Sequence, residues 1–387
     1  MVKPVGYSLA SYGDMIRDHA RMQPYLQALS QAVQPGATVV DIGAGPGMFS
    51  FLACRYGAGH VHAIEPDPSI EIAQAIAVAN GLADRITFHR TLSTEVVLPE
   101  PADVIISDLR GVLPLLQAHV SSIADARTRL LRPGGTLIPR RDTLHVALSE
   151  DVDVYQGYAD PWQHNRFDVD MSAGQQQVVN TWRKVNASAA SLLSDPQKLA
   201  TLDYRTIEHP HLDAEVELRA ARPGTAHGLL VWFDAELAEG IGFSNAPGGP
   251  ELIYGQAFFP LALPVLLDPR DRVTVRLRAD LVEGDYLWRW DTTATRADDP
   301  GSIKAGFRQS TFQGVDLSPA SLRKRRDDFV PTLSADGHVD ALILEAMGQQ
   351  RPLGDIAKEL TVRFADRFPD PQDALDRVAK LSVRYSD

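Results

Sequence analysis

The sequence predicts a doubly wound parallel α/β sheet, followed by an antiparallel β-barrel-like region and a small helical C-terminal region. Three observations support this prediction. A glycine-rich turn follows a short apolar run at 37–47, strands and helices alternate up to about residue 140, and β-rich segments separated by Pro and Gly replace them afterwards. Short strands that alternate with helices are typical of parallel sheets, which bind ligands at the carboxyl ends of their strands.

Segment 37–47, Ala-Thr-Val-Val-Asp-Ile-Gly-Ala-Gly-Pro-Gly, is the most informative element. Its β-branched residues predict a buried strand from Thr38 to Ile42. The glycines at 43, 45 and 47 let the backbone turn tightly and approach a ligand. The apolar stretch 48–56 predicts a helix whose first amides would face that ligand. The glycine spacing differs from the G-x-G-x-x-G of dinucleotide sites, and such a turn can also be purely structural.

The following elements indicate a nucleoside-binding domain. A second strand, 60–64, ends at Glu65, about twenty residues after the glycines, where an acid can accept both hydrogen bonds of a ribose diol. A helix begins at Pro68 and is closed by Asn80-Gly81. Further strands are predicted at 86–90, at 104–107 before Asp108, and after the turn 132–135.

Beyond this domain we expect two more. Residues 1–140 form the first, 141–320 the barrel-like second with an arm at about 150–195, and 321–387 the helical third. The expected strands of the second domain are 143–148, 215–220, 228–233, 256–259, 273–277 and 286–290. The expected helices of the third are 339–347, 353–364 and 371–385, with a core of Leu344, Ile356, Leu360, Val378 and Leu381.

Composition restricts the function classes. A chain of 387 residues exceeds one ordinary domain, and its net charge of −12 argues against general binding to nucleic acid or to an anionic membrane. No apolar run is long enough for a transmembrane span, and the N-terminal residues lack the apolar core of a signal peptide. The single Cys54 excludes an internal disulfide and a Cys-based zinc site, and the His-x-His pairs at 60 and 209 lack a third ligand. We expect a cytoplasmic protein without a bound metal.

Residues 5–295 resemble the protein arginine methyltransferases. This family joins a class I methyltransferase sheet, which binds S-adenosylmethionine, to a β-barrel that carries a dimerisation arm. The stretch Asp14-Met15-Ile16-Arg17-Asp18-His19-Ala20-Arg21 is similar to the family's N-terminal helix pattern Glu-Met-Leu-Lys-Asp-x-x-Arg. Phe233-Asp234-Ala235-Glu236 with Gly242-Phe243-Ser244 is similar to a segment of the family's barrel.

The resemblance implies an intact cofactor site, with one departure: Ser93 stands near the position of a family glutamate that touches adenine. Arg21 would meet the methionine carboxylate, Met15 would shape a cap over the cofactor, and Glu65 would hold the ribose. The full set of implied cofactor residues is Tyr12, Met15, Arg21, Asp41, Gly43, Gly45, Glu65, Leu92 and Ser93.

The departures from the family fall on arginine recognition. In the family, two glutamates nine residues apart grip the guanidinium. Here Asp108 holds the first position with a shorter side chain, the neutral Gln117 holds the second, and Arg110 would add a positive charge. A cation needs paired carboxylates to be desolvated. The family's histidine in a Thr-His-Trp motif is also missing, because that position falls near Leu252-Ile253-Tyr254.

The leading hypothesis is therefore an S-adenosylmethionine-dependent methyltransferase whose arginine pocket is degenerate. It would act as a homodimer on a side chain of a peptide or small protein, such as a ribosomally made natural-product precursor. Asp108 would orient or deprotonate the acceptor, although it could instead serve only as a helix cap or bind backbone. The alternatives are a small-molecule natural-product methyltransferase, a catalytically idle cofactor-binding module, and a nicotinamide dehydrogenase, which the glycine spacing disfavours.

The C-terminal helices weakly resemble the small winged-helix peptide-binding domains of peptide modification systems, such as the one in pyrroloquinoline-quinone biosynthesis. The cues are Asp336-Gly337 before the first helix and the stretch 351–357 at the start of the second. This resemblance implies a module that recruits the peptide. A docking or dimerisation appendage is the alternative.

Overall fold

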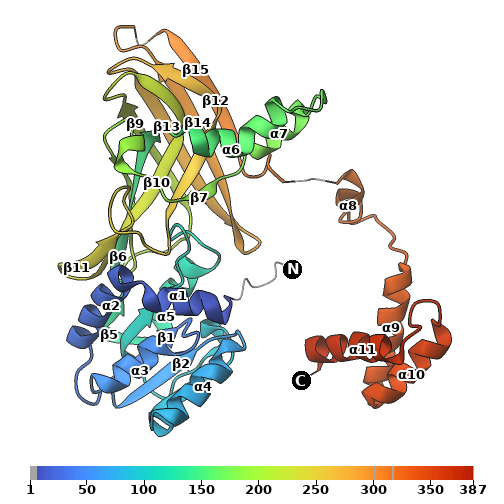
Figure 1. Cartoon of the computed structure of the whole chain (residues 1–387). Coiled ribbons are helices and arrows are strands. Elements are labelled where there is room, and N and C mark those ends of the chain that lie inside the picture. The colour runs from blue at the N-terminus through green and yellow to red at the C-terminus, as the bar shows by residue number, and fades with distance from the viewer. Residues whose placement is uncertain (1–6, 300, 316–317, 387) are drawn as a thin grey trace. The chain divides into compact units, whose positions relative to one another are not determined.

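The computed structural model of the chain describes residues 7–299, 301–315 and 318–386 (Figure 1). The chain divides between residues 315 and 316 into two compact units. Residues 1–6, part of the stretch considered as a signal segment, lie outside the described ranges. Within those ranges no helix is both long and apolar enough to cross a bilayer. The same ranges contain no group of three or more His, Cys, Asp or Glu side chains arranged to hold a metal ion.

The first unit begins with the predicted parallel sheet, in the order β3-β2-β1-β4-β5. The order reverses between β1 and β4, so the crevice for a ligand lies outside the carboxyl ends of these two strands. The strands are β1 (Thr38–Ile42), β2 (His60–Ile64), β3 (Ile86–His89), β4 (Ala102–Ser107) and β5 (Leu131–Ile138). The helices are α1 (Leu9–Arg17), α2 (His19–Ala32), α3 (Met48–Arg55), α4 (Ser69–Ala79) and α5 (His119–Arg129).

One boundary of this sheet differs from the prediction. The stretch 132–135 lies inside β5 and is not a turn that precedes it. Gly134 has a φ of +76°, in the left-handed region, and the register between β4 and β5 shifts nearby. Glycine permits this local bend without ending the strand.

The second part of this unit consists of two antiparallel sheets. A six-stranded sheet has the order β7-β12-β10-β6-β8, with β11 paired to β10, and a four-stranded sheet has the order β15-β14-β13-β9. The strands are β6 (Arg141–Ser149), β7 (Arg183–Val185), β8 (Gln197–Asp203), β9 (Leu212–Arg219), β10 (Gly224–Ala238), β11 (Ile241–Ser244), β12 (Gln256–Leu267), β13 (Arg272–Val282), β14 (Asp285–Thr295) and β15 (Ile303–Ser310).

One apolar core joins the two sheets, with Phe233 and Phe259 from one and Trp288 and Trp290 from the other. The same core continues into the parallel sheet. Strands β7, β8, β11 and β15 were missed by the sequence analysis. They are short or largely polar, and none of them has a run of apolar residues that marks a buried strand.

Helices α6 (Val152–Gln163) and α7 (Ser172–Val178) project from the side of these sheets at the expected arm (Figure 1). Trp162 packs inside the arm, because a Cβ at Gly174 of α7 would lie 2.1 Å from its ring. Phe167, between the helices, is 76% exposed. Trp162 thus packs α6 against α7, whereas Phe167 is exposed to solvent.

The second unit contains α8 (Pro319–Arg323), α9 (Ala335–Gly348), α10 (Leu353–Arg363) and α11 (Pro371–Tyr385). Helices α9 to α11 enclose a separate core that includes Ile356, Leu360, Val378 and Leu381, as expected. The fifth expected core residue is wrong: Leu344 is 40% exposed, and its neighbour Ile343 is buried instead. Residues 318–386 contain no strand, so this part of the chain lacks a wing of the kind that the winged-helix resemblance implied.

Candidate active site

The glycine turn between β1 and α3 forms a narrow cradle. Gly43, Gly45 and Gly47 all have positive φ. A Cβ at Gly45 would lie 2.6 Å from the ring of Tyr12, and a Cβ at Gly43 would lie 2.3 Å from Leu109. Side chains at these positions would therefore clash with the two residues that cover the turn.

Two buried carboxylates face this cradle. Glu65 follows β2 and accepts hydrogen bonds from the amides of Gly45 (3.0 Å) and Asp67 (2.9 Å). Asp41 in β1 accepts a hydrogen bond from the Ser50 hydroxyl at 2.7 Å, and its other oxygen, Oδ1, is buried without a partner. Burial raises the pKa of Glu65, and it raises the pKa of Asp41 to about 7 despite the hydrogen bonds from Ser50.

The remaining expected cofactor residues border the same cradle. Tyr12 and Met15 lie on α1, which has no buried residue and so covers the turn from outside. The Tyr12 hydroxyl lies 3.5 Å from that of Ser69 at the start of α4. Leu92 and Ser93 follow the carboxyl end of β3, beside the strand that leads to Glu65; Ser93 is buried and Leu92 is half-exposed.

Next to the cradle lies a set of four buried charged side chains, Arg21, Asp108, Arg110 and Asp142, which we call the charge cluster. Arg21 donates to Asp108 Oδ2 through Nε (2.8 Å) and Nη2 (2.5 Å). Arg110 donates to Asp108 Oδ1 at 3.1 Å and to both oxygens of Asp142 at 2.7 and 2.9 Å. Each of these four side chains is at most 7% exposed. The two arginines and two aspartates of the charge cluster thus carry no net charge.

Neutral groups complete the hydrogen bonding of the charge cluster. The Tyr254 hydroxyl donates to Asp108 Oδ2 at 2.6 Å, and the Tyr25 hydroxyl accepts from Arg110 at 2.6 Å. Tyr204 donates to Asp142 at 2.6 Å and lies 2.9 Å from His119 Nε2. Since Tyr204 has one proton to donate, His119 must carry its own proton on Nε2. Burial lowers the pKa of His119 to about 3, which keeps this histidine neutral.

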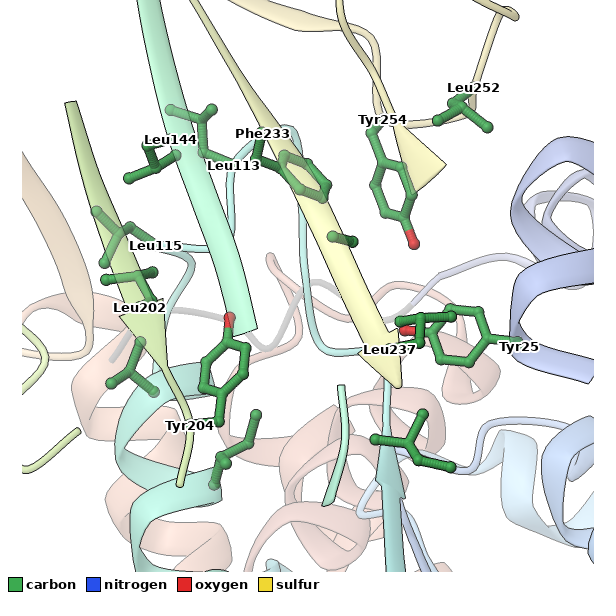
Figure 2. Close-up of a cluster of buried hydrophobic side chains, with 14 of the residues drawn as sticks. Tyr25, Leu113, Leu115, Leu144, Leu202, Tyr204, Phe233, Leu237, Leu252 and Tyr254 are labelled. Carbon is green, nitrogen blue, oxygen red and sulfur yellow. The ribbon is translucent and has the colours of Figure 1, made fainter. Parts of the chain in front are cut away.

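Aromatic rings surround the two guanidinium groups. The Arg21 guanidinium carbon lies 5.5 Å from the ring centre of Tyr25, and that of Arg110 lies 5.7 and 5.8 Å from Phe233 and Phe243. Figure 2 shows Tyr25 and Tyr254 with their hydroxyl groups directed into the space between them, among apolar side chains such as those of Leu113 and Leu237. The charge cluster is therefore enclosed by apolar and aromatic packing.

This environment sets the protonation state of Asp108. Burial by itself raises the pKa of this carboxyl, but the charges of Arg21 and Arg110 and the hydrogen bond from Tyr254 lower it to about 2. A carboxylate with so low a pKa accepts protons poorly near neutral pH. Asp108 can orient an acceptor, and it is unsuited to act as a general base.

Two further expectations change. Arg110 adds no unbalanced positive charge, because Asp142 pairs with it through two hydrogen bonds. Gln117 lies after the turn that follows β4, with a φ of +43°, and takes no part in the hydrogen bonds of the charge cluster. The second carboxylate near Asp108 is therefore Asp142 on β6, and Arg110 already occupies it.

Sequence reasoning missed several of these residues. Asp142, Tyr25, Tyr204 and His119 carried no motif, and their distance from Asp108 along the chain gave no signal. Tyr254 was noticed only as the position where a histidine is missing. Its match to the position of the family's histidine was the available clue, because a polar side chain at a family site position can take over a hydrogen bond.

An open pocket of about 280 Å³ lies beside the charge cluster, between α1 and the loop before β12. Two of its lining residues, Asp18 and Ile253, are joined by a hydrogen bond from the Ile253 amide to Asp18 Oδ2 at 2.9 Å. The pocket is lined by Asp14, Arg17, Asp18, Lys184, Asn186, Glu251, Leu252 and Ile253. Lys184 donates to the Ile253 carbonyl, and Glu251 accepts from the Asn186 side chain at 2.7 Å. Among the described residues, neither Lys184 nor Glu251 has an oppositely charged partner.

Comparison with known proteins relates both parts of the first unit to methyltransferases. The family model described as ribosomal protein L11 methyltransferase matches residues 18–140, and that of the arginine methyltransferase oligomerization subdomain matches residues 140–286. The chain is 33% identical over 321 residues to "Probable histone-arginine methyltransferase CARM1" of Oryza sativa subsp. indica, covering 79% of this chain and 61% of that protein. It is 31% identical over 234 residues to "Probable protein arginine N-methyltransferase 6" of Arabidopsis thaliana, covering 58% and 54%.

The chain thus spans between half and two thirds of the length of these two relatives. It spans 74% of "Arginine N(omega)-methyltransferase" of Streptomyces achromogenes subsp. streptozoticus, to which it is 29% identical. Two solved structures have the same fold: the Trypanosoma brucei PRMT1 enzyme-prozyme complex with AdoHcy and Arabidopsis thaliana protein arginine methyltransferase 10. Their TM-scores are 0.72 and 0.68 at 20% and 21% identity, over 78% of this chain and 98% and 97% of theirs. The first unit therefore has the class I methyltransferase fold joined to an antiparallel sheet domain.

The pairing of Arg110 with Asp142 predicts strong energetic coupling. Asp142→Asn alone leaves a buried guanidinium without its main counter-charge and should lower the free energy of unfolding by about 3–5 kcal/mol. Adding Arg110→Met should recover part of this loss. Urea unfolding of the four members of the double-mutant cycle measures the coupling. The exposed pair Arg17–Asp14 is the control, and its coupling should be below about 1 kcal/mol. Additive effects of Arg110→Met and Asp142→Asn would contradict the assigned pairing.

Asp41 predicts a pH-dependent stability in the absence of ligand. Because its pKa rises from 3.8 to about 7 on folding, the folded state binds more protons than the unfolded state between these values. The free energy of unfolding should therefore fall as pH increases from about 4 to 7. Asp41→Asn should flatten this decline in thermal melts, whereas the exposed Asp84→Asn should leave it unchanged. An identical pH profile in Asp41→Asn would show that Asp41 is ionised throughout.

Proposed function

We propose that the chain is a methyltransferase that uses S-adenosylmethionine and is of the arginine methyltransferase type. The observation that carries this proposal is the glycine cradle with the Glu65 carboxylate hydrogen-bonded across it. The likeness to proteins named arginine methyltransferases supports it, as does the shared fold with a structure whose title names AdoHcy. A purely structural turn would not need two buried carboxylates beside it.

The residues of the cradle fit this cofactor. Glu65 retains acceptor capacity for a ribose diol, and the buried Asp41 Oδ1 lacks a partner, which a polar group of a ligand would satisfy. Arg21 also donates to the carbonyl of Met15, and a methionine carboxylate would be a stronger acceptor for that group. Tyr12 and Met15 would cover the cofactor, and Leu92 and Ser93 would border its adenine. When bound, the cofactor supplies an electrophilic methyl group.

The balanced charges argue against an arginine held in the conventional way. A substrate guanidinium would enter a site whose carboxylates, Asp108 and Asp142, already face two internal guanidiniums. A third buried cation would have no counter-charge. We therefore infer a neutral or anionic acceptor, such as a side-chain nitrogen, hydroxyl or carboxylate. Its lone pair forms the bond to the methyl carbon as the carbon–sulfur bond breaks, and any displaced proton leaves to solvent.

The open pocket supports an acceptor that is part of a peptide or small protein. It offers a cation, Lys184, and an anion, Glu251, that lack an oppositely charged partner among the described residues. Lys184 donates to the carbonyl of Ile253, the residue before Tyr254. Residues beside the methylated side chain would lie there. The second unit, with its separate core, would recruit the same peptide.

We also propose a homodimer formed through the arm. The stretch between α6 and α7 exposes Phe167, Val169 and Met171. The oligomerization subdomain model matches the residues that include this arm. Exposed apolar side chains on a projecting element are suited to bury against a second copy.

The cofactor assignment predicts the effect of Glu65→Ala. Loss of a buried carboxylate that accepts from two ribose hydroxyls should weaken binding of S-adenosylhomocysteine by about 100-fold. Isothermal titration calorimetry measures this directly. Glu71→Ala, which removes an exposed carboxylate on α4, is the matched control and should bind normally. Normal binding by Glu65→Ala would refute the assignment of this acid.

The acceptor assignment predicts the outcome of restoring the family's glutamates. Asp108→Glu combined with Gln117→Glu should not improve native activity, because the longer carboxylate disturbs the pairing with Arg21 and Arg110. Asp108→Asn should lower kcat more than it raises KM, since the charge orients the acceptor during transfer. Mass spectrometry of natural targets reports the acceptor. Methylated arginine produced by the unmodified protein would overturn this assignment.

If the arm forms the dimer interface, charged substitutions in the arm should prevent dimerisation. Full-length protein at micromolar concentration should have the mass of two chains by light scattering. Phe167→Asp with Met171→Asp should give single chains, because burying two carboxylates at the interface is costly. Val97→Asp, at an 86% exposed position outside the arm, is the control. A monomeric wild-type protein would show that the arm does not mediate pairing.

A further inference from the structure

We propose that Tyr254 is a positioning residue that fixes Asp108 and Arg21 relative to each other, so that the acceptor site and the cofactor site act as one unit. This inference rests on the proposed function, because it describes how that site is held together. Tyr254 stands where the sequence analysis found only a missing histidine.

The hydrogen bonds of Tyr254 form a closed triangle. Its hydroxyl donates to Asp108 Oδ2 at 2.6 Å and accepts from Arg21 Nε at 3.0 Å. Arg21 Nε also donates to the same Asp108 oxygen at 2.8 Å. A single phenol therefore contacts both members of the ion pair and limits the rotation of either one.

The packing of Tyr254 makes it rigid enough for this role. Its ring stacks on Phe243 with centres 5.6 Å apart and an interplanar angle of 4°, and it meets Phe233 edge-on at 5.4 Å. Only 5% of the residue is exposed. These contacts come from β10 and β11, so the antiparallel sheets hold the hydroxyl in place.

Asp18 connects the backbone on both sides of the triangle. Its Oδ1 accepts from the amide of Arg21 at 3.0 Å, and its Oδ2 accepts from the amide of Ile253 at 2.9 Å. The loop that carries Tyr254 and the helix that carries Arg21 are thus joined by one carboxylate. Side-chain and backbone contacts constrain the same pair of elements.

The chemistry explains why a tyrosine suits this position. Asp108 is pulled by Arg21 on one side and by Arg110 on the other. If Arg21 donates some of its hydrogen bonds to a cofactor carboxylate, the Tyr254 hydroxyl still donates to Asp108 Oδ2. This hydrogen bond keeps Asp108 from shifting towards Arg110. A phenol donates this bond without charge. A protonated histidine would add a third cation to a charge cluster that two aspartates balance.

The groups that face the Tyr254 hydroxyl are Asp108 and Arg110 from the loop after β4, and Arg21 and Tyr25 from α2. Burial and the Asp108 charge raise the pKa of Tyr254 well above its ordinary value, so the phenol stays neutral and remains a donor. The contact is therefore independent of pH in the physiological range.

The test is calorimetric binding of S-adenosylhomocysteine to the full chain. Tyr254→Phe keeps the ring and removes the hydroxyl, and we expect affinity to fall by about 10-fold. If Tyr254 acts through Asp108, the hydroxyl matters little once Asp108 is neutralised. Tyr254→Phe in an Asp108→Asn background should then cost less than 2-fold, as an order-of-magnitude expectation for coupled groups.

Tyr286→Phe is the matched control, because it removes another partly buried tyrosine hydroxyl, which donates to the Pro210 carbonyl before β9. It should leave affinity unchanged in both backgrounds. Unchanged binding by Tyr254→Phe, or equal losses in the two backgrounds, would overturn the inference. A wild-type protein that does not bind S-adenosylhomocysteine would instead overturn the proposed function, so the two failures are distinguishable.

Discussion

The structure of the first unit depends on how two buried arginines are neutralised. Arg21 comes from α2, Asp108 and Arg110 from the loop after β4, and Asp142 from β6. These elements belong to both the parallel sheet and the antiparallel sheets. Because a buried charge without a partner is costly, the two parts of the unit cannot shift apart without exposing or isolating a charge. The charge cluster therefore fixes their relative position and the local chemistry together.

This constraint also limits what the site can bind. The charge cluster already contains as many cations as anions, and the tyrosines and His119 that contact them are neutral. A cofactor carboxylate could approach Arg21, because the Arg21 guanidinium can pair with that carboxylate as well as with Asp108. A substrate guanidinium would need a new anion. The same balance that stabilises the fold thus favours acceptors other than an arginine gripped by two acids, even though the relatives are named arginine methyltransferases.

Tyr254 and Asp18 show how neutral and backbone contacts support this balance. Asp18 begins α2 and holds the loop before β12, and Tyr254 connects that loop to Asp108. The open pocket lies against the same residues. The loop before β12, the start of α2 and the loop after β4 are thus joined by direct hydrogen bonds.

The sequence by itself determined the parallel sheet, because strand runs, glycine spacing and Glu65 are local patterns that recur at short range. It also located the three C-terminal helices, although it chose Leu344 for the core in place of Ile343. When the packing partners of a helix are unknown, the choice of its buried residues can be wrong by one position. Only the tertiary structure showed that Arg110 pairs with Asp142, that Tyr254 contacts Asp108, and that two arginines and Tyr254 lower the pKa of Asp108. Those results depend on contacts between residues far apart in the chain. The charge of such residues and their spacing along the sequence do not reveal how far apart they lie in space.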